Sequence, residues 1–250
     1  MQSRERRSAE KAEVRTRILD AAREILLAEG CDALSMRKLA ARIGYTATAL
    51  YFHFPDKDAL LAELVGTDFL KFRRSFSRLE KVADPLERLR RMGHVFVDFG
   101  LKNPGHYRLM FMTLHTTGKD PRDNPVIEHG NPDQDAYAFL RGTVAECLAA
   151  GRFRPEFTDV ELLTQVFLAG THGLVSMHLV KGDQCWVPWR PIRARARVMV
   201  DALIRGLTLP DPPGRAPGAT NPRATDPDAT DLDERDDPDD PGAGETDPGP

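Results

Sequence analysis

The stretch that decides the fold is ALSMRKLAARIGYTATALYFHF, residues 33–54. Ser35 is a favoured helix N-cap residue and Gly44 a favoured residue just past a helix end, which predicts a short helix over 35–42. Thr46 begins another helix, too short to be stable alone. The apolar side chains that would fix the crossing angle of these two helices are Leu39, Ile43 and Leu50. Two short helices joined by a turn that contains glycine are typical of a helix-turn-helix motif.

A longer helix is expected on each side of this stretch. On the amino-terminal side, an apolar stripe at helical spacing predicts an amphipathic helix that ends at Gly30; its members are Val14, Ile18, Ala22 and Ile25. On the other side, Pro55 interrupts the chain and Asp56 caps a long helix that we expect to reach about Val82. The short second helix of the motif has the size that enters the major groove of B-DNA.

Residues 17–64 closely resemble the DNA-binding domain of the TetR family of bacterial repressors. The resemblance rests on an Ala-rich first helix, Gly30, the Leu-Ala pair at 39–40, Gly44 and an array that begins Leu50-Tyr51 and continues through His53-Phe54 to Lys57 and Leu60. It implies a three-helix DNA-binding domain, a helical ligand-binding and dimerisation domain, and release of operator DNA when a small molecule binds.

The resemblance also assigns roles to individual residues. Thr46, Ala47 and Thr48 would face base edges, with Tyr45 reaching base or backbone. Phosphate contacts are implied for Ser35, Arg37, Tyr51, His53 and Lys57. Residues 46–50 hold no Arg, Lys, Asn or Gln, so we expect specificity to depend on methyl groups, hydroxyls and DNA shape. We interpret Phe52 and Phe54 as packing residues.

The remaining chain has helical periodicity and no sustained alternating pattern, so the expected class is all-α with about nine helices. The further helices are predicted over about 86–101, 104–115, 133–150, 159–181 and 190–207, with a loop over 116–132. The domains that we expect are a flexible basic arm (1–10), a helix-turn-helix domain (11–56), a ligand-binding and dimerisation domain (57–209) and a tail (210–250).

The net charge of −3 conceals a separation of charge along the chain. From Pro210 onward there are 12 acidic and 3 basic residues, which leaves the body with a net charge of +6. The tail has one large apolar side chain, Leu232, so it is predicted to be a disordered, acidic segment whose role the sequence does not reveal. A basic body is compatible with a nucleic-acid partner.

Two segments of the second domain resemble one TetR subgroup, namely Asn103–Phe111 and the Thr171-His172-Gly173 element, although Leu168 stands near the place where that subgroup has Trp. We expect an effector pocket between these helices, lined mostly by apolar groups. The candidates are Tyr107, Met110, Phe111, Phe139, Phe167, His172 and Met177. Each of them is also compatible with ordinary core packing.

Apolar stripes in the last two helices predict a dimer interface built as a four-helix bundle. Its candidates are Leu163, Phe167, Gly170, Leu174, Ile192, Met199 and Leu203. Two-fold symmetry would require a palindromic operator.

No cofactor and no metal site are expected, because the histidines and the three cysteines lack ligand spacing. The sequence contains no GxSxG, HExxH or phosphate-cradling glycine loop, so an enzyme is the least favoured class. No run of residues is long and apolar enough to span a membrane, and the protein is expected in the cytoplasm. The partners that we expect are double-stranded operator DNA, a small molecule and a second copy of the chain. A ligand-independent regulator and an activator remain alternatives to a repressor.

Overall fold

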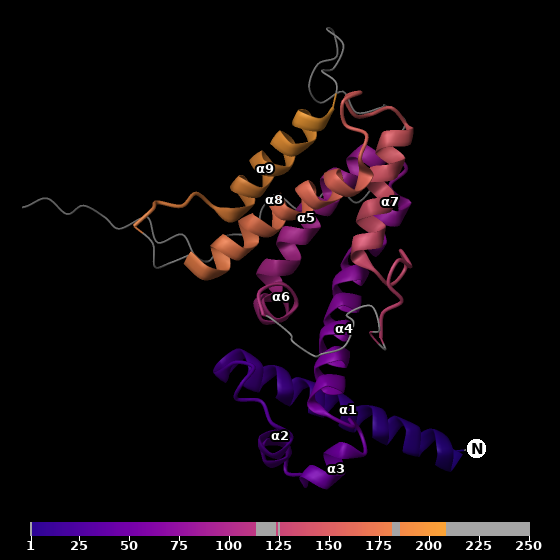
Figure 1. Ribbon diagram of the computed structural model, residues 1–250, viewed down its shortest axis with the longest axis vertical. Coiled ribbons are helices and arrows are strands. Elements are labelled where there is room, and N and C mark those ends of the chain that lie inside the picture. Colours follow the sequence, from indigo (N-terminus) through magenta and orange to yellow (C-terminus); the bar gives the residue numbers. More distant parts are fainter. Residues whose placement is uncertain (1, 114–123, 125, 182–185, 209–250) are drawn as a thin grey trace, which may run out of the picture. The chain divides into compact units, whose positions relative to one another are not determined.

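The computed structural model describes residues 2–113, 124, 126–181 and 186–208 (Figure 1). Within these residues the regular structure is helical, apart from one isolated bridge between Phe153 and Thr208. The predicted all-α class is therefore confirmed. The predicted tail and most of the predicted loop over 116–132 lie outside the described residues.

The first helix, α1, spans Gln2–Glu29. Ile18, Ala22 and Ile25 of the predicted stripe are buried, and the helix ends before Gly30, whose φ of 86° suits glycine. Its amino-terminal end differs from the sequence expectation, because residues 2–10 continue the helix instead of forming a separate arm. This segment has no proline or glycine, and an i,i+4 ion pair between Arg6 and Glu10 at 2.9 Å supports it.

The next two helices are α2 (Met36–Ile43) and α3 (Ala47–Tyr51), and their capping residues are those expected from the sequence. The Ser35 side chain accepts a hydrogen bond from the Lys38 backbone N–H, and the Thr46 side chain accepts one from Ala49. Gly44 follows α2 with a left-handed φ of 74°. The caps therefore fix the ends of both helices locally.

Helix α4 (Lys57–Ser75) begins at its Asp56 cap as expected but ends seven residues before the predicted end at Val82. Phe76 is 2% exposed, and its backbone N–H bonds to the Arg73 carbonyl at 3.0 Å, which tightens the last turn. A 3₁₀ helix, η1 (Ser77–Lys81), follows. The chain turns here because Phe76 and Leu79 pack into the core, a contact that helical periodicity alone does not reveal.

The second half of the described chain consists of α5 (Pro85–Lys102), α6 (Pro104–Phe111), α7 (Ala136–Ala149), α8 (Val160–Lys181) and α9 (Ile192–Leu207). Each overlaps a predicted helix, with prolines in the first turns of α5 and α6. Helix α5 packs against α7, α8 and α9, so it occupies the middle of this bundle.

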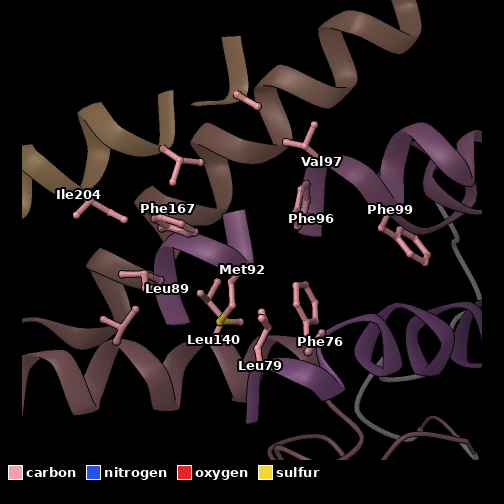
Figure 2. Packing of buried hydrophobic residues seen from close by; sticks show 14 of the residues in the cluster. Phe76, Leu79, Leu89, Met92, Phe96, Val97, Phe99, Leu140, Phe167 and Ile204 are labelled. Atoms are coloured by element: carbon pink, nitrogen blue, oxygen red, sulfur yellow. The ribbon is translucent and has the colours of Figure 1, made fainter. Parts of the chain in front are cut away.

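The buried apolar side chains form two clusters. One joins α1, α2, α3, the first half of α4 and Leu109 of α6. The larger cluster is shared by the second half of α4 and the helices from α5 to α9. Figure 2 shows part of it, with Met92 from α5, Leu140 from α7 and Phe167 from α8 gathered in the interior. Because α4 and α6 contribute to both clusters, they connect the amino-terminal helices to the bundle.

Candidate nucleic-acid interface and interior cavity

Helix α3 presents polar and aromatic side chains on its outer surface. Thr48 is exposed, Tyr51 is 52% exposed, and Leu50 from the same short helix is fully buried. Leu50 thus anchors α3 against α2, and Thr48 and Tyr51 remain accessible to a partner. Ala47 is partly buried at the start of the helix.

The two cap residues already have an intramolecular role. Ser35 and Thr46 both use their hydroxyl oxygens as acceptors for backbone N–H groups. Both residues are exposed, so each hydroxyl proton can still be donated to an acceptor on a partner.

Arg37 is exposed on α2, whereas Tyr45 lies partly buried in the turn, with the Arg17 guanidinium 5.8 Å from its ring centroid. Two further cations on α2 are engaged in ion pairs with α1: Lys38 pairs with Glu29, and Arg42 pairs with Glu24 at 3.1 Å. Arg37 is therefore more available to a phosphate than its two neighbours.

His53 and Lys57, expected as phosphate contacts, differ in their present interactions. The Lys57 ammonium donates to the Cys31 carbonyl at 2.7 Å, tying α4 to the turn after α1. His53 is partly buried, and its ring Nδ1 has no hydrogen-bond partner among the described residues. Burial first, and then the nearby Arg15 and Lys11 cations, lower the pKa of His53, so its ring is neutral near pH 7.

The two phenylalanines after α3 differ from each other. Phe54 is 1% exposed, which confirms the expected packing role. Phe52 is 79% exposed, so the same expectation was wrong for Phe52. The reason is the helical turn: Phe52 follows α3 on its outer side, and Leu50 and Phe54 occupy the available core positions.

Arg15 of α1 holds this segment in place, a role that the sequence did not reveal. Its guanidinium donates to the His53 carbonyl, forms a two-point ion pair with Glu63 of α4, and lies 4.2 Å from the Phe54 ring centroid. Arg15 therefore connects α1, the residues after α3 and α4.

A buried polar cluster lies where α1, α4 and α6 meet. The Asp68 carboxylate is 1% exposed, and its Oδ1 accepts hydrogen bonds from Arg23 at 2.5 Å and from His106 Nδ1 at 2.8 Å. Arg23 also pairs with the exposed Asp20 at 2.9 Å. Asp68 of α4 thus binds Arg23 of α1, 45 positions away in the sequence, and His106 of α6, 38 positions away.

The bundle contains a partly open cavity of about 330 Å³. Its described lining is mainly aromatic and comes from α4 or its end, α5, α6, α7, α8 and the loop before α7. The lining residues are Phe69, Phe72, Phe76, Met92, Phe96, Phe111, Ile127, His129, Asp135, Ala136, Tyr137, Leu140, Phe167, Leu168 and Thr171. Four of the six phenylalanines were not anticipated as pocket residues, although Phe69, Phe72 and Phe76 recur at helical spacing.

Of the seven residues expected at a pocket, Phe111 and Phe167 line this cavity. Tyr107 and His172 lie next to it, since the His172 ring is 5.8 Å from the Phe111 ring. Met110 is buried elsewhere in the core, and Phe139 packs on Phe76 at 6.4 Å and under Arg73. Met177 does not line the cavity, because it is 50% exposed on the outer face of α8.

Tyr107 and His172 form a hydrogen-bonded pair between α6 and α8. The Tyr107 hydroxyl lies 2.7 Å from His172 Nδ1. Burial raises the pKa of Tyr107 and lowers the pKa of His172, so a protonated phenol donating to a neutral imidazole is the favoured state.

Several residues expected at a dimer interface are buried within the chain. Leu163, Phe167 and Leu174 are at most 8% exposed, and Ile192, Met199 and Leu203 pack partly buried against the same core. A methyl group on Gly170 would lie 2.9 Å from Leu203, so this glycine permits α8 and α9 to approach within one chain.

The face of α8 that stays exposed is a different one. It carries Leu162, Val166, Met177 and Val180. Apolar residues cover both faces of α8, so periodicity did not indicate the buried one.

The described residues contain no group of three or more His, Cys, Asp or Glu side chains placed to hold a metal ion. None of their helices is long and apolar enough to cross a membrane.

Two family models match the chain, one for each part of this architecture. Residues 18–64 match the model described as bacterial regulatory proteins, tetR family, and residues 89–203 match the model described as tetracyclin repressor-like, C-terminal domain. The first covers the carboxy-terminal part of α1, all of α2 and α3 and the start of α4, and the second covers α6, α7, α8 and most of α5 and α9.

Sequence relatives match over a shorter region. An uncharacterized HTH-type transcriptional regulator, YobS of Bacillus subtilis, is 30% identical over 100 residues, which are 39% of this chain and 51% of that protein. The nucleoid occlusion factor SlmA of Vibrio campbellii is 32% identical over 106 residues, 41% of this chain and 53% of that protein. The matched region spans about half the length of these relatives.

Solved structures share the fold over a longer stretch. A protein of unknown function from Rhodococcus sp. RHA1 has a TM-score of 0.62 at 24% identity, covering 78% of this chain and 95% of that one. FadR of Bacillus subtilis, in complex with stearoyl-CoA, has a TM-score of 0.62 at 17% identity, covering 77% and 98%. With the two family models matching the two parts of the structure, the chain belongs to the TetR family of bacterial regulatory proteins.

Proposed function

We propose that the protein is a homodimeric repressor that releases a palindromic operator when a small, largely hydrophobic molecule occupies the interior cavity. The observation that carries this proposal is the position of the cavity. Its walls include α4 and α6, and both helices also contact α1 of the amino-terminal domain.

A shift of α4 or α6 has a direct route to the DNA-binding surface. Helix α4 is joined to α1 through Glu63 and Asp68, and α6 is joined to the same Asp68 through His106. A ligand that separates Phe69 of α4 from Phe111 of α6, now 5.5 Å apart, would move both ends of this link. Differential binding to the two arrangements would then change the affinity for DNA.

For the DNA contacts, we propose that Thr46 and Thr48 face base edges and that Ser35, Arg37 and Tyr51 contact phosphates. The exposure of these five residues supports these roles. Ala47 and Tyr45 would contribute apolar contact at the edge of the site. Lys57 would contact phosphate only if it gave up its hydrogen bond to the Cys31 carbonyl, and the His53 ring is partly buried, so we expect both to contribute less.

For the dimer, we propose that the exposed apolar stripe of α8 (Leu162, Val166, Met177 and Val180), with Val198 of α9, packs against a second copy. These five side chains are between 42% and 69% exposed in the single chain. Their spacing along α8 keeps them on one face, and exposed apolar surface of this kind is typical of an interaction site.

The dimer is tested by analytical ultracentrifugation of Val166→Arg beside Glu156→Arg, which adds a cation at an exposed loop position. Val166→Arg should sediment as a monomer, while Glu156→Arg sediments as the native protein. A dimeric Val166→Arg protein would refute the proposed stripe.

The operator is identified by selecting fragmented genomic DNA on the purified protein and sequencing what is retained. Thr48→Ala should weaken binding to the selected site by about 1 kcal/mol, roughly fivefold, and relax the preference at one base pair of each half-site. Tyr51→Phe should weaken all duplexes alike, because a phosphate contact carries no sequence information. Thr67→Ala, exposed on α4, is the matched control. Unchanged selectivity in Thr48→Ala would refute the base contact.

An activator is the alternative with the same DNA-binding chemistry. The position of the selected sites relative to promoters distinguishes the two, since a repressor site overlaps the promoter and an activator site lies upstream of it.

A further inference from the structure

The described part of the cavity wall is poor in groups that could neutralise a charge. Among its described lining residues there is no lysine or arginine, and six of the fifteen are phenylalanine. Four of these rings pack on one another around Phe72, with Phe76, Phe96 and Phe111 at centroid distances of 4.9 to 5.8 Å. A ligand here would meet aromatic faces and edges over most of its surface.

The polar groups in the wall are already engaged. The Thr171 hydroxyl donates within α8, with the carbonyls of Phe167 at 3.0 Å and Leu168 at 3.1 Å as acceptors. The Tyr137 hydroxyl donates to Glu161. Neither hydroxyl therefore has a proton free to hydrogen-bond a ligand oxygen without breaking an existing bond.

Asp135 is the only acidic residue among the described lining residues. Its carboxylate caps the amino-terminal end of α7. Its Oδ1 accepts from the backbone N–H of Tyr137 at 2.8 Å, and its Oδ2 accepts from that of Gly130 at 3.0 Å. His129 Nδ1 lies 3.6 Å from the same Oδ2. A ligand carboxylate or phosphate placed here would lose its hydration, meet no lysine or arginine among the described lining residues and be repelled by Asp135.

We infer that the cavity selects an uncharged aromatic or alicyclic molecule and rejects an anionic one of the same shape. This inference rests on the proposed role of the cavity as the effector site. An engineered apolar cavity of about 150 Å³ holds one benzene ring, so about 330 Å³ suits a compact ligand of two to three rings.

The test uses two fluorescent probes that share one ring system. N-phenyl-1-naphthylamine is uncharged, and 8-anilinonaphthalene-1-sulfonate adds a sulfonate. Titrated into the purified protein, the neutral probe should bind one site per chain at least about tenfold more tightly than the anion, because the anion cannot replace its hydration in this wall. Equal affinity, tighter binding of the anion, or no binding of either probe would overturn the inference.

Two variants assign the binding to this cavity. Ala136→Trp fills the space and should abolish binding of the neutral probe, with circular dichroism and thermal melting verifying that the helices remain. Leu168→Lys places an ammonium in the wall and should reduce the preference for the neutral probe over the anion by about tenfold. An unchanged preference in a folded Leu168→Lys protein would refute the electrostatic argument.

Binding and release of DNA are measured separately, so the two proposals can fail independently. If the neutral probe binds with the expected preference but does not change operator affinity, the selectivity of the cavity stands and the effector role in the proposed function fails. If an anion alone releases the operator while binding at this cavity, the inference on ligand class is overturned and the repressor proposal stands.

Discussion

Replacing Asp68 by Asn removes the charge that joins α1, α4 and α6 while keeping the shape of the side chain. The carboxylate is 1% exposed and accepts from Arg23 at 2.5 Å and from His106 at 2.8 Å. Its Oδ2 has no hydrogen-bond partner among the described residues, so an amide nitrogen in that place would find no acceptor there. The substitution thus leaves the Arg23 guanidinium, 15% exposed, without its buried counterion.

Removing one partner of a buried ion pair costs about 3–5 kcal/mol, because the remaining charge stays buried and unpaired. Arg23 keeps Asp20 at its exposed end, which places the expected loss at the lower limit, about 3 kcal/mol. For a chain of this length, that corresponds to a fall in Tm of roughly 6–12 °C.

Asp20→Asn is the matched control, since Asp20 pairs with the same guanidinium at 2.9 Å but is 61% exposed. Its expected cost is about 0.2–1 kcal/mol. Both variants are unfolded in urea at one protein concentration, because dissociation of the proposed dimer would make the midpoint depend on concentration. If Asp68→Asn and Asp20→Asn lose the same free energy of unfolding, then Asp68 does not hold the three helices together as argued.

Three further outcomes follow from the packing. Gly100→Ala should destabilise the fold by about 1–3 kcal/mol, because the added methyl would lie 2.4 Å from Val175. Gly142→Ala, where the methyl meets nothing within 4 Å, should stabilise α7 by about 0.5–1 kcal/mol. If the denaturation midpoints of Gly100→Ala and Gly142→Ala both fall by the same amount, this pair of expectations is contradicted. His172→Asn keeps an acceptor for Tyr107 but does not titrate. Burial lowers the pKa of His172, so the unfolded chain binds more protons just below the ordinary value of 6.5, and stability is lost as the pH falls through that value. The free energy of unfolding in urea should fall more between about pH 7.5 and about pH 5.5 for the native chain than for His172→Asn. Equal falls would exclude His172 as a source of this pH dependence.

The amino-acid sequence by itself determined the features that depend on neighbours along the chain. Ser35, Thr46 and Asp56 cap their helices as expected, and Gly44 ends α2, because caps are local hydrogen bonds and local backbone conformations. The TetR resemblance over residues 17–64 rested on the same local spacing, and the tetR family model matches residues 18–64.

Only the tertiary structure decided which surfaces are buried and which distant residues meet. Phe52 and Phe54 are alike in the sequence, yet the fold exposes Phe52 and packs Phe54 beside Leu50 in the amino-terminal core. Helix α8 is apolar on both faces, so the face against α9 was settled by packing and not by periodicity.

The same reason explains the polar cluster and the cavity. Asp68 meets Arg23 across 45 positions of sequence, and the cavity collects side chains from five helices and a loop. Local preferences fix the backbone of each helix, but burial, ion pairing and enclosed space depend on how the helices are arranged around one another. These quantities are long-range, and the spacing of residues in one helix does not contain them.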